Sequence, residues 1–137
     1  MVKKFSAQVD DIIKKNEKRL IALARQSNQM LIDQAQLPVA KGGKMRLDTG
    51  FLRASGQASL NGLPTGPTRG DERDYEYNRH TTTTTLAGLN LGGVFFFGWT
   101  ANYASVRETY DGFLGSAVQN WQNIVDKVAT EIKTRIK

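Results

Sequence analysis

Apolar residues recur at intervals of three and four along the first part of the chain, a spacing that predicts an amphipathic helix. Ser6 is suited to the N-cap position, and Pro38 disfavours helical geometry at the residue before it. The helix is therefore expected to span roughly residues 6–35, about 45 Å. Its stripe comprises Phe5, Val9, Ile12, Ile13, Leu20, Leu23, Ala24, Met30 and Leu31, with Asn16 and Ser27 on the same side. A second stripe, from Phe113 to Ile136, predicts a closing helix.

Extended segments are expected between these two helices. Residues 48–55 predict a tight turn, because the side chains of Asp48 and Thr49 are able to satisfy backbone N–H groups there. A strand is expected to follow as far as Leu60. The five consecutive threonines from Thr81 to Thr85 also predict an extended segment, because β-branched side chains favour strands.

Residues 94–99 predict a strand that is apolar on both faces. Alternation places Phe95, Phe97 and Trp99 on one face, and Val94 and Phe96 on the other. Both faces then need to be covered. A helix of the same chain is able to cover one of them, whereas the other requires either a neighbouring subunit or further packing within the domain.

This order of elements predicts an α+β fold, with a long N-terminal helix, a small antiparallel sheet and a C-terminal helix. The helices are expected on one face of the sheet. The length of 137 residues fits a single structural domain over residues 1–137. A Gly- and Pro-rich stretch followed by dense charge predicts a flexible loop at residues 61–80.

Composition narrows the functional classes. The chain has no cysteine and one histidine, His80, which excludes disulfides, thiolate metal sites and multi-histidine metal sites. Its serines lie in no nucleophile-elbow sequence, and its acidic residues lack calcium-loop spacing. We therefore expect a protein that is not an enzyme, has no catalytic residues and binds no metal or cofactor. It has no apolar run long enough to span a bilayer, so we expect synthesis in the cytoplasm.

The net charge is +6, and the excess lies mainly in the N-terminal segment, where residues 1–46 carry 10 basic and 4 acidic side chains. One alternative hypothesis is a module that binds DNA or a membrane surface non-specifically through the N-terminal helix. Asp10, Asp11 and Glu17 on the same helix weigh against it, and a solvated face of mixed charge is an equally good interpretation. The cations that would contact phosphates are Lys14, Lys15, Lys18, Arg19 and Arg25.

Three segments together resemble one family. Residues 47–55, Leu-Asp-Thr-Gly-Phe-Leu-Arg-Ala-Ser, resemble the D-T-G-x-L-R-x-S signature of the bacteriophage HK97 gene-product-10-like neck and tail-component family. Residues 98–108 are similar to the segment of that family with the pattern Y-A-x-x-V-E-x-G, and residues 113–117 to its F-L-x-x-A. The long first helix also fits.

The resemblance implies a structural virion protein at the head–tail interface of a tailed bacteriophage. Such a subunit acts in head–tail joining as a tail terminator, tail-completion or neck protein. It assembles with copies of itself into a ring, hexameric in the family, and joins the tail to the DNA-filled head. The expected partners are connector and tail-tube proteins, with at most non-specific contact with passing DNA and no membrane. No cofactor comes with the family.

The resemblance also assigns roles to particular residues. The segment of Asp48, Thr49, Gly50, Phe51, Leu52 and Arg53 is then a structural turn, in which Gly50 allows the backbone geometry and Phe51 and Leu52 pack inward. Rings are built from contacts between two different patches of one subunit. Trp99 and Tyr103 are candidates for such contacts, with ordinary core packing as the alternative. Further interface candidates lie in the loop, at Arg69, Arg73, Tyr75 and Tyr77.

Overall fold

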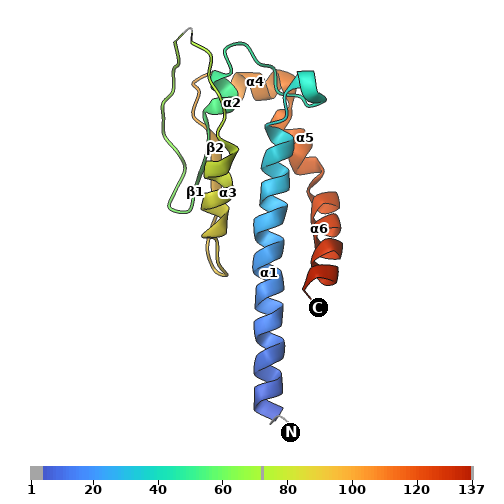
Figure 1. Ribbon diagram of the computed structural model, residues 1–137. Coiled ribbons are helices and arrows are strands. Elements are labelled where there is room, and N and C mark those ends of the chain that lie inside the picture. Colours follow the sequence, from blue (N-terminus) through green and yellow to red (C-terminus); the bar gives the residue numbers. More distant parts are fainter. Residues whose placement is uncertain (1–4, 72, 137) are drawn as a thin grey trace.

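The fold is α+β, as the sequence predicts: a long N-terminal helix, a small antiparallel sheet and a C-terminal helix (Figure 1). The computed structural model describes residues 5–71 and 73–136. Its elements are α1 (Phe5–Ala35), the 3₁₀ turn η1 (Val39–Lys41), α2 (Phe51–Ala54), β1 (Gly56–Ser59), α3 (Arg79–Ala87), β2 (Phe96–Trp99), α4 (Ala104–Asp111), α5 (Phe113–Gln119) and α6 (Trp121–Arg135).

Helices α1 and α6 lie side by side and run in opposite directions (Figure 1). Ile124, Val128 and Ile132 of α6 are buried against the apolar stripe of α1, including Leu23 and Met30. This packing ends near Arg19, whose Nε donates a hydrogen bond of 2.9 Å to the carbonyl of Ile136 at the end of α6. Residues 6–18 of α1 continue past that point, and all but one of them are exposed.

Elements of the chain itself lie against both faces of the two-stranded sheet. Pairing of Gly56 with Trp99, and of Ala58 with Phe97, sets one face toward the helices, where Trp99 packs edge-on against Phe113 at 5.0 Å. On the opposite face, Gln57 Nε2 donates a 3.0 Å hydrogen bond to the carbonyl of Gly66. The segment after β1 therefore covers part of the second face, while β2 itself remains half-buried.

The threonine run forms helix α3, so the prediction of an extended segment is wrong. Asn78 caps the helix by accepting a hydrogen bond from the backbone N–H of His80 at 3.1 Å. The hydroxyl of Thr85 bonds to the carbonyl of Thr81 at 2.8 Å, four residues earlier. Thr82 and Leu86 are buried on one side of the helix. Tertiary packing on this side overrides the weak intrinsic preference of threonine for strands.

The closing helix is broken in two, whereas the sequence predicts one continuous stripe. The break falls at Asn120, whose side-chain amide donates a 2.9 Å hydrogen bond to Gln34 Oε1 on α1. Helix α5 ends there and α6 begins. The preceding segment, without an element in the sequence prediction, forms α4 and ends at Gly112 with φ of 66°.

Gln36 joins three elements at the C-terminal end of α1. Its side chain is buried, accepts the indole N–H of Trp99 at 2.8 Å and donates to the carbonyl of Arg53 at 2.9 Å. Arg53 Nε returns a bond of 2.7 Å to the backbone carbonyl of Gln36. These bonds tie α1, α2 and β2 together.

Replacement of Gln36 by Leu should lower the free energy of unfolding by about 2–4 kcal/mol, because it leaves the Trp99 N–H and the Arg53 carbonyl buried without a partner. Urea unfolding followed by Trp fluorescence measures the loss. The matched control is Gln122→Leu, at an exposed glutamine whose side chain bonds only to Asp126 within α6. Equal stability of the two variants would contradict a bridging role for Gln36.

Candidate functional site

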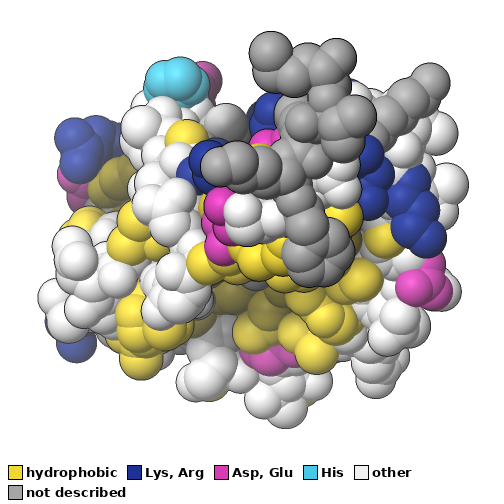
Figure 2. Space-filling view, turned by 90° about the horizontal axis from the view of Figure 1, so that it is seen from below, with side chains coloured by type: hydrophobic (Ala, Val, Ile, Leu, Met, Phe, Trp, Pro, Cys, Tyr) yellow, Lys and Arg dark blue, Asp and Glu magenta, His cyan; other side chains and the backbone are white. Residues whose placement is uncertain are grey.

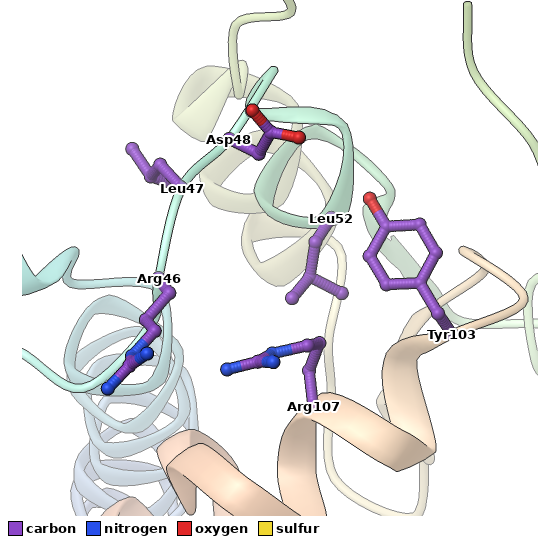
Figure 3. A pocket seen from close by; sticks show the side chains of 7 residues that line it. Arg46, Leu47, Asp48, Leu52, Tyr103 and Arg107 are labelled. Atoms are coloured by element: carbon purple, nitrogen blue, oxygen red, sulfur yellow. The ribbon is translucent and has the colours of Figure 1, made fainter.

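Two of the three family-like segments meet at one open pocket of about 470 Å³. The first segment contributes lining residues from the stretch between η1 and the start of α2, and the second contributes lining residues at the start of α4 (Figure 3). The two are about fifty positions apart in the sequence, so only the fold brings them together. The lining residues are Arg46, Leu47, Asp48, Gly50, Leu52, Tyr103 and Arg107.

The structural turn forms the wall of this pocket and largely behaves as predicted. Gly50 has φ of 84°, and a Cβ there would lie 2.5 Å from the carbonyl oxygen of Tyr75. Thr49 Oγ1 accepts a 3.3 Å hydrogen bond from the N–H of Phe51. Phe51 and Leu52 are buried. These observations confirm the predictions for Thr49, Gly50, Phe51 and Leu52.

Asp48 does not fix the turn, and the prediction for this residue is wrong. Its side chain is exposed and accepts no hydrogen bond from the described part of the chain. Figure 3 shows the carboxylate at the rim of the pocket, on the same side as the hydroxyl of Tyr103. The turn is instead held by Thr49, which also accepts a 2.8 Å hydrogen bond from the N–H of Tyr75 through its backbone carbonyl.

Two arginines face each other across the pocket (Figure 3). Arg107 binds Asp111 with both ends of its guanidinium group, and its Nε lies 3.1 Å from Asp111 Oδ2. Arg46 Nε lies 3.7 Å from the same carboxylate. The Asp111 side chain is 4% exposed, so it holds Arg107 in place while most of the Arg46 side chain remains in solvent. Such a fork-to-carboxylate pair is rigid and well oriented.

Tyr103 closes the third side of the pocket. Burial has the largest effect and raises the pKa of its phenol. The Leu52 backbone opposes this with the second largest effect, and the charge of Asp48 adds a smaller rise. The hydroxyl is therefore protonated at neutral pH and is able to donate a hydrogen bond into the pocket. Tyr103 is 39% exposed, which leaves its predicted contact with another subunit sterically open.

Two interface candidates of the long loop, Tyr75 and Tyr77, pack onto the structural turn. The rings of Tyr75 and Phe51 pack edge-on, with their centroids 5.1 Å apart. The guanidinium of Arg53 lies over the ring of Tyr77, 5.1 Å from its centroid. Burial raises the pKa of Tyr77, whose hydroxyl lies 2.7 Å from Thr82 Oγ1. These two side chains therefore hold the loop against the body.

The arginines of this loop point outward. Arg73 bonds to Asp71 at 2.9 Å and covers the Tyr75 ring, and both partners are exposed. Arg69 is exposed and has no bonded partner among the described residues. Trp99, by contrast, belongs to the core around Phe113 and Gln36. Its packing matches the core alternative, whereas the predicted subunit contacts of Trp99 and the two arginines stay predictions.

Sequence reasoning did not single out the cationic side of the pocket. Arg107 and Asp111 are four residues apart on α4, a spacing typical of helical ion pairs, and this signal was present in the sequence. Arg46 offered no comparable signal, because only the path of the chain after η1 brings it to Asp111. Arg53 was placed in the turn, but its bond to Gln36 depends on the tertiary structure.

The pocket combines an apolar floor at Leu52, the phenol of Tyr103 and two arginine side chains that both approach the Asp111 carboxylate. Within residues 5–71 and 73–136, no three His, Cys, Asp or Glu side chains are grouped to hold a metal ion. No helix among those residues is long and apolar enough to cross a membrane.

Gly50→Ala should destabilise the fold by about 2–4 kcal/mol, because a Cβ adds a clash with the Tyr75 carbonyl to the strain of positive φ. Gly42→Ala is the matched control. Gly42 has φ of 92°, but a Cβ there meets nothing within 4 Å, so the loss should be about 1 kcal/mol. Chemical denaturation compares the two variants, and equal losses would show that the approach of the Tyr75 backbone contributes nothing.

Comparison of the chain with protein-family models, with curated proteins and with solved structures finds no match.

Proposed function

We propose that this chain is a non-enzymatic structural protein of a tailed bacteriophage particle, which assembles into a ring at the head–tail interface. Its role there is tail termination or completion, or that of a neck protein. One observation carries the proposal of self-assembly. The first half of α1 extends beyond the rest of the molecule and presents apolar side chains that no described part of the chain covers (Figure 1).

The uncovered surface is substantial for a small protein. Ile12, Ile13 and Leu20 are 59%, 48% and 53% exposed. Figure 2, which views the molecule from this end, shows hydrophobic side chains gathered around a hollow, with Lys and Arg side chains at the margin. Full burial of one such side chain stabilises an assembly by about 1.5–3 kcal/mol. Large exposed apolar side chains on one helix face are typical of interaction sites.

The charges beside the apolar stripe favour a contact between unlike surfaces. Helical geometry places Asp10 and Glu17 along one edge of the stripe, and Lys15 and Arg19 along the other. An antiparallel two-fold pair of this segment would set the acidic edge against its own copy, and like charges repel. A contact with a different patch of the neighbour avoids this, and such heterologous contacts are the ones that close into rings.

The family resemblance supplies the location in the particle. The segment that resembles this signature forms a turn in which Gly50 has a left-handed backbone and Phe51 and Leu52 face inward. The second family-like segment lies beside it in the pocket that holds Tyr103. This pocket and the free half of α1 are two different surfaces of one subunit, which is the arrangement that a ring requires.

Substitution of Ile12 and Ile13 by Asp should abolish self-association, because two charges would then have to be buried in the contact. Size-exclusion chromatography with light scattering compares the purified variant with the wild type, which should form a species larger than a monomer. Leu91→Asp is the matched control, since Leu91 is a 50% exposed leucine in the turn before β2. Loss of assembly in both variants, or in neither, would contradict a specific contact through α1.

The role in the particle is tested by electron microscopy of phage produced without this chain. Filled heads beside unattached tails are the expected result for a joining protein, and tails of abnormal length point to termination. Normal joined particles would refute the head–tail assignment, whatever the purified protein does.

A further inference from the structure

An apolar groove of about 380 Å³ lies between α1 and α3. The two helices pack side by side (Figure 1). The apolar lining of the groove consists of Ala22 on α1 and of Leu86 and Ala87 on α3. Two of these residues are alanines, whose short side chains leave the space between the helices open. The groove is therefore able to receive apolar side chains from outside.

Polar contacts between α1 and the α3 region hold the groove in shape. Toward the C-terminal end of α1, Arg79 Nε lies 2.8 Å from Asp33 Oδ1. Nearer the middle of α1, Arg25 Nε donates a 2.9 Å hydrogen bond to the carbonyl of Leu89, just after α3. The groove lies between these two ties. A ligand thus meets a preformed site, and less ordering is needed for it to bind.

The charged side chains that line the groove are cationic. Among the described residues of its lining, Arg25 and Arg135 are the charged ones. Arg25 donates to neutral acceptors, the Leu89 carbonyl and Asn90 Oδ1 at 3.2 Å. The side-chain amide of Gln26 accepts a hydrogen bond of 2.9 Å from Arg135. The groove therefore favours an apolar occupant that carries acidic side chains at its edge.

We propose that this groove receives the free half of α1 from a second copy of the chain. The inference rests on the proposed self-association and names the patch that the free half contacts. The free half presents Ile12 and Ile13, both exposed, with Asp10 and Glu17 at the edge of its apolar stripe. Lys14 lies farther round the helix from Ile13 than either of these acids. An amphipathic helix that lays its apolar face into a groove is a common mode of recognition.

The occupant has to come from another molecule. Helix α1 is continuous from Ile12 to Ala22, a rise of about 15 Å, so its free half is unable to fold back into its own groove. At about 100° per residue, the step from Ile13 to Ala22 also turns to the opposite side of the helix. Each copy therefore donates with one side of α1 and accepts with the other. Such a heterologous contact is able to continue from subunit to subunit around a ring.

Two other hollows fit this occupant less well. In the pocket beside the structural turn, Arg46 and Arg107 both approach the Asp111 carboxylate, which offsets the positive charge that an acidic edge would meet. The groove lined by Leu20 and Lys133 has a volume of only about 120 Å³. The groove between α1 and α3 therefore combines the larger apolar space with the better matched charge.

Two variants that each remove one side of the contact test the inference. Ile12→Asp with Ile13→Asp removes the donor, whereas Ala87→Glu fills the groove and places a carboxylate beside its arginines. Size-exclusion chromatography with light scattering should find each variant monomeric where the wild type is assembled. An equimolar mixture should contain a species of about twice the monomer mass, because one intact helix still meets one intact groove.

Ala40→Glu is the matched control, since Ala40 is an exposed alanine of η1 outside the groove, and this variant should assemble like the wild type. Circular dichroism checks that all variants fold. Assembly of the Ala87→Glu variant, with loss in the Ile12 and Ile13 variant, would overturn the groove as acceptor and leave self-association through α1 intact. A mixture that stays monomeric would also overturn it. A monomeric wild type would refute self-association itself.

A disulfide between copies tests the contact directly, because the chain has no cysteine of its own. Ile13→Cys combined with Ala87→Cys in one chain should give a ladder of oligomers on a non-reducing gel after mild oxidation. Ile13→Cys combined with Ala40→Cys should give none, since Ala40 lies outside the groove. Ladders of equal strength from both pairs, or from neither, would contradict docking in the groove.

Discussion

The buried amide of Gln36 is the contact on which the rest of the structure depends. It accepts the indole N–H of Trp99 and donates to the carbonyl of Arg53, so it joins the end of α1 to the sheet and to the structural turn. A polar group in a core is costly unless all its bonds are made, and here the two partners come from two other elements, β2 and α2. This requirement orients α1 relative to everything that follows it.

Once α1 is anchored at its C-terminal end, its N-terminal half is left outside the body. The helix is longer than α6, which ends near Arg19, and no described element continues along the remaining stripe. The two ends of α1 therefore carry different surfaces. The anchored end carries the turn and the pocket, and the free end carries apolar side chains flanked by charges of both signs. A structural subunit that contacts unlike neighbours needs such a separation of surfaces.

Loop packing explains how so small a sheet is stable. Two strands alone are marginal in water, yet β1 and β2 are covered on one face by helices and in part on the other by the segment after β1. The same segment returns to place Tyr75 on Phe51 and Tyr77 beneath Arg53. Its Gly, Pro and charged composition predicts a loop at residues 61–80. The described residues from 61 to 78 form no helix or strand, whereas Arg79 and His80 already belong to α3. The contacts of this segment with the body come from the aromatic residues that it carries.

The sequence by itself determined the elements whose information is local. The apolar period specifies α1 and the closing helical stripe, the alternation of Phe and Trp specifies β2, and Gly50 allows the left-handed turn before α2. Tertiary structure decided the rest. The threonine run became helical because Thr82 and Leu86 find a buried surface there, and the closing stripe broke where Asn120 meets Gln34. The pocket joins segments far apart in the chain, and such a pairing depends on packing, which no local pattern records.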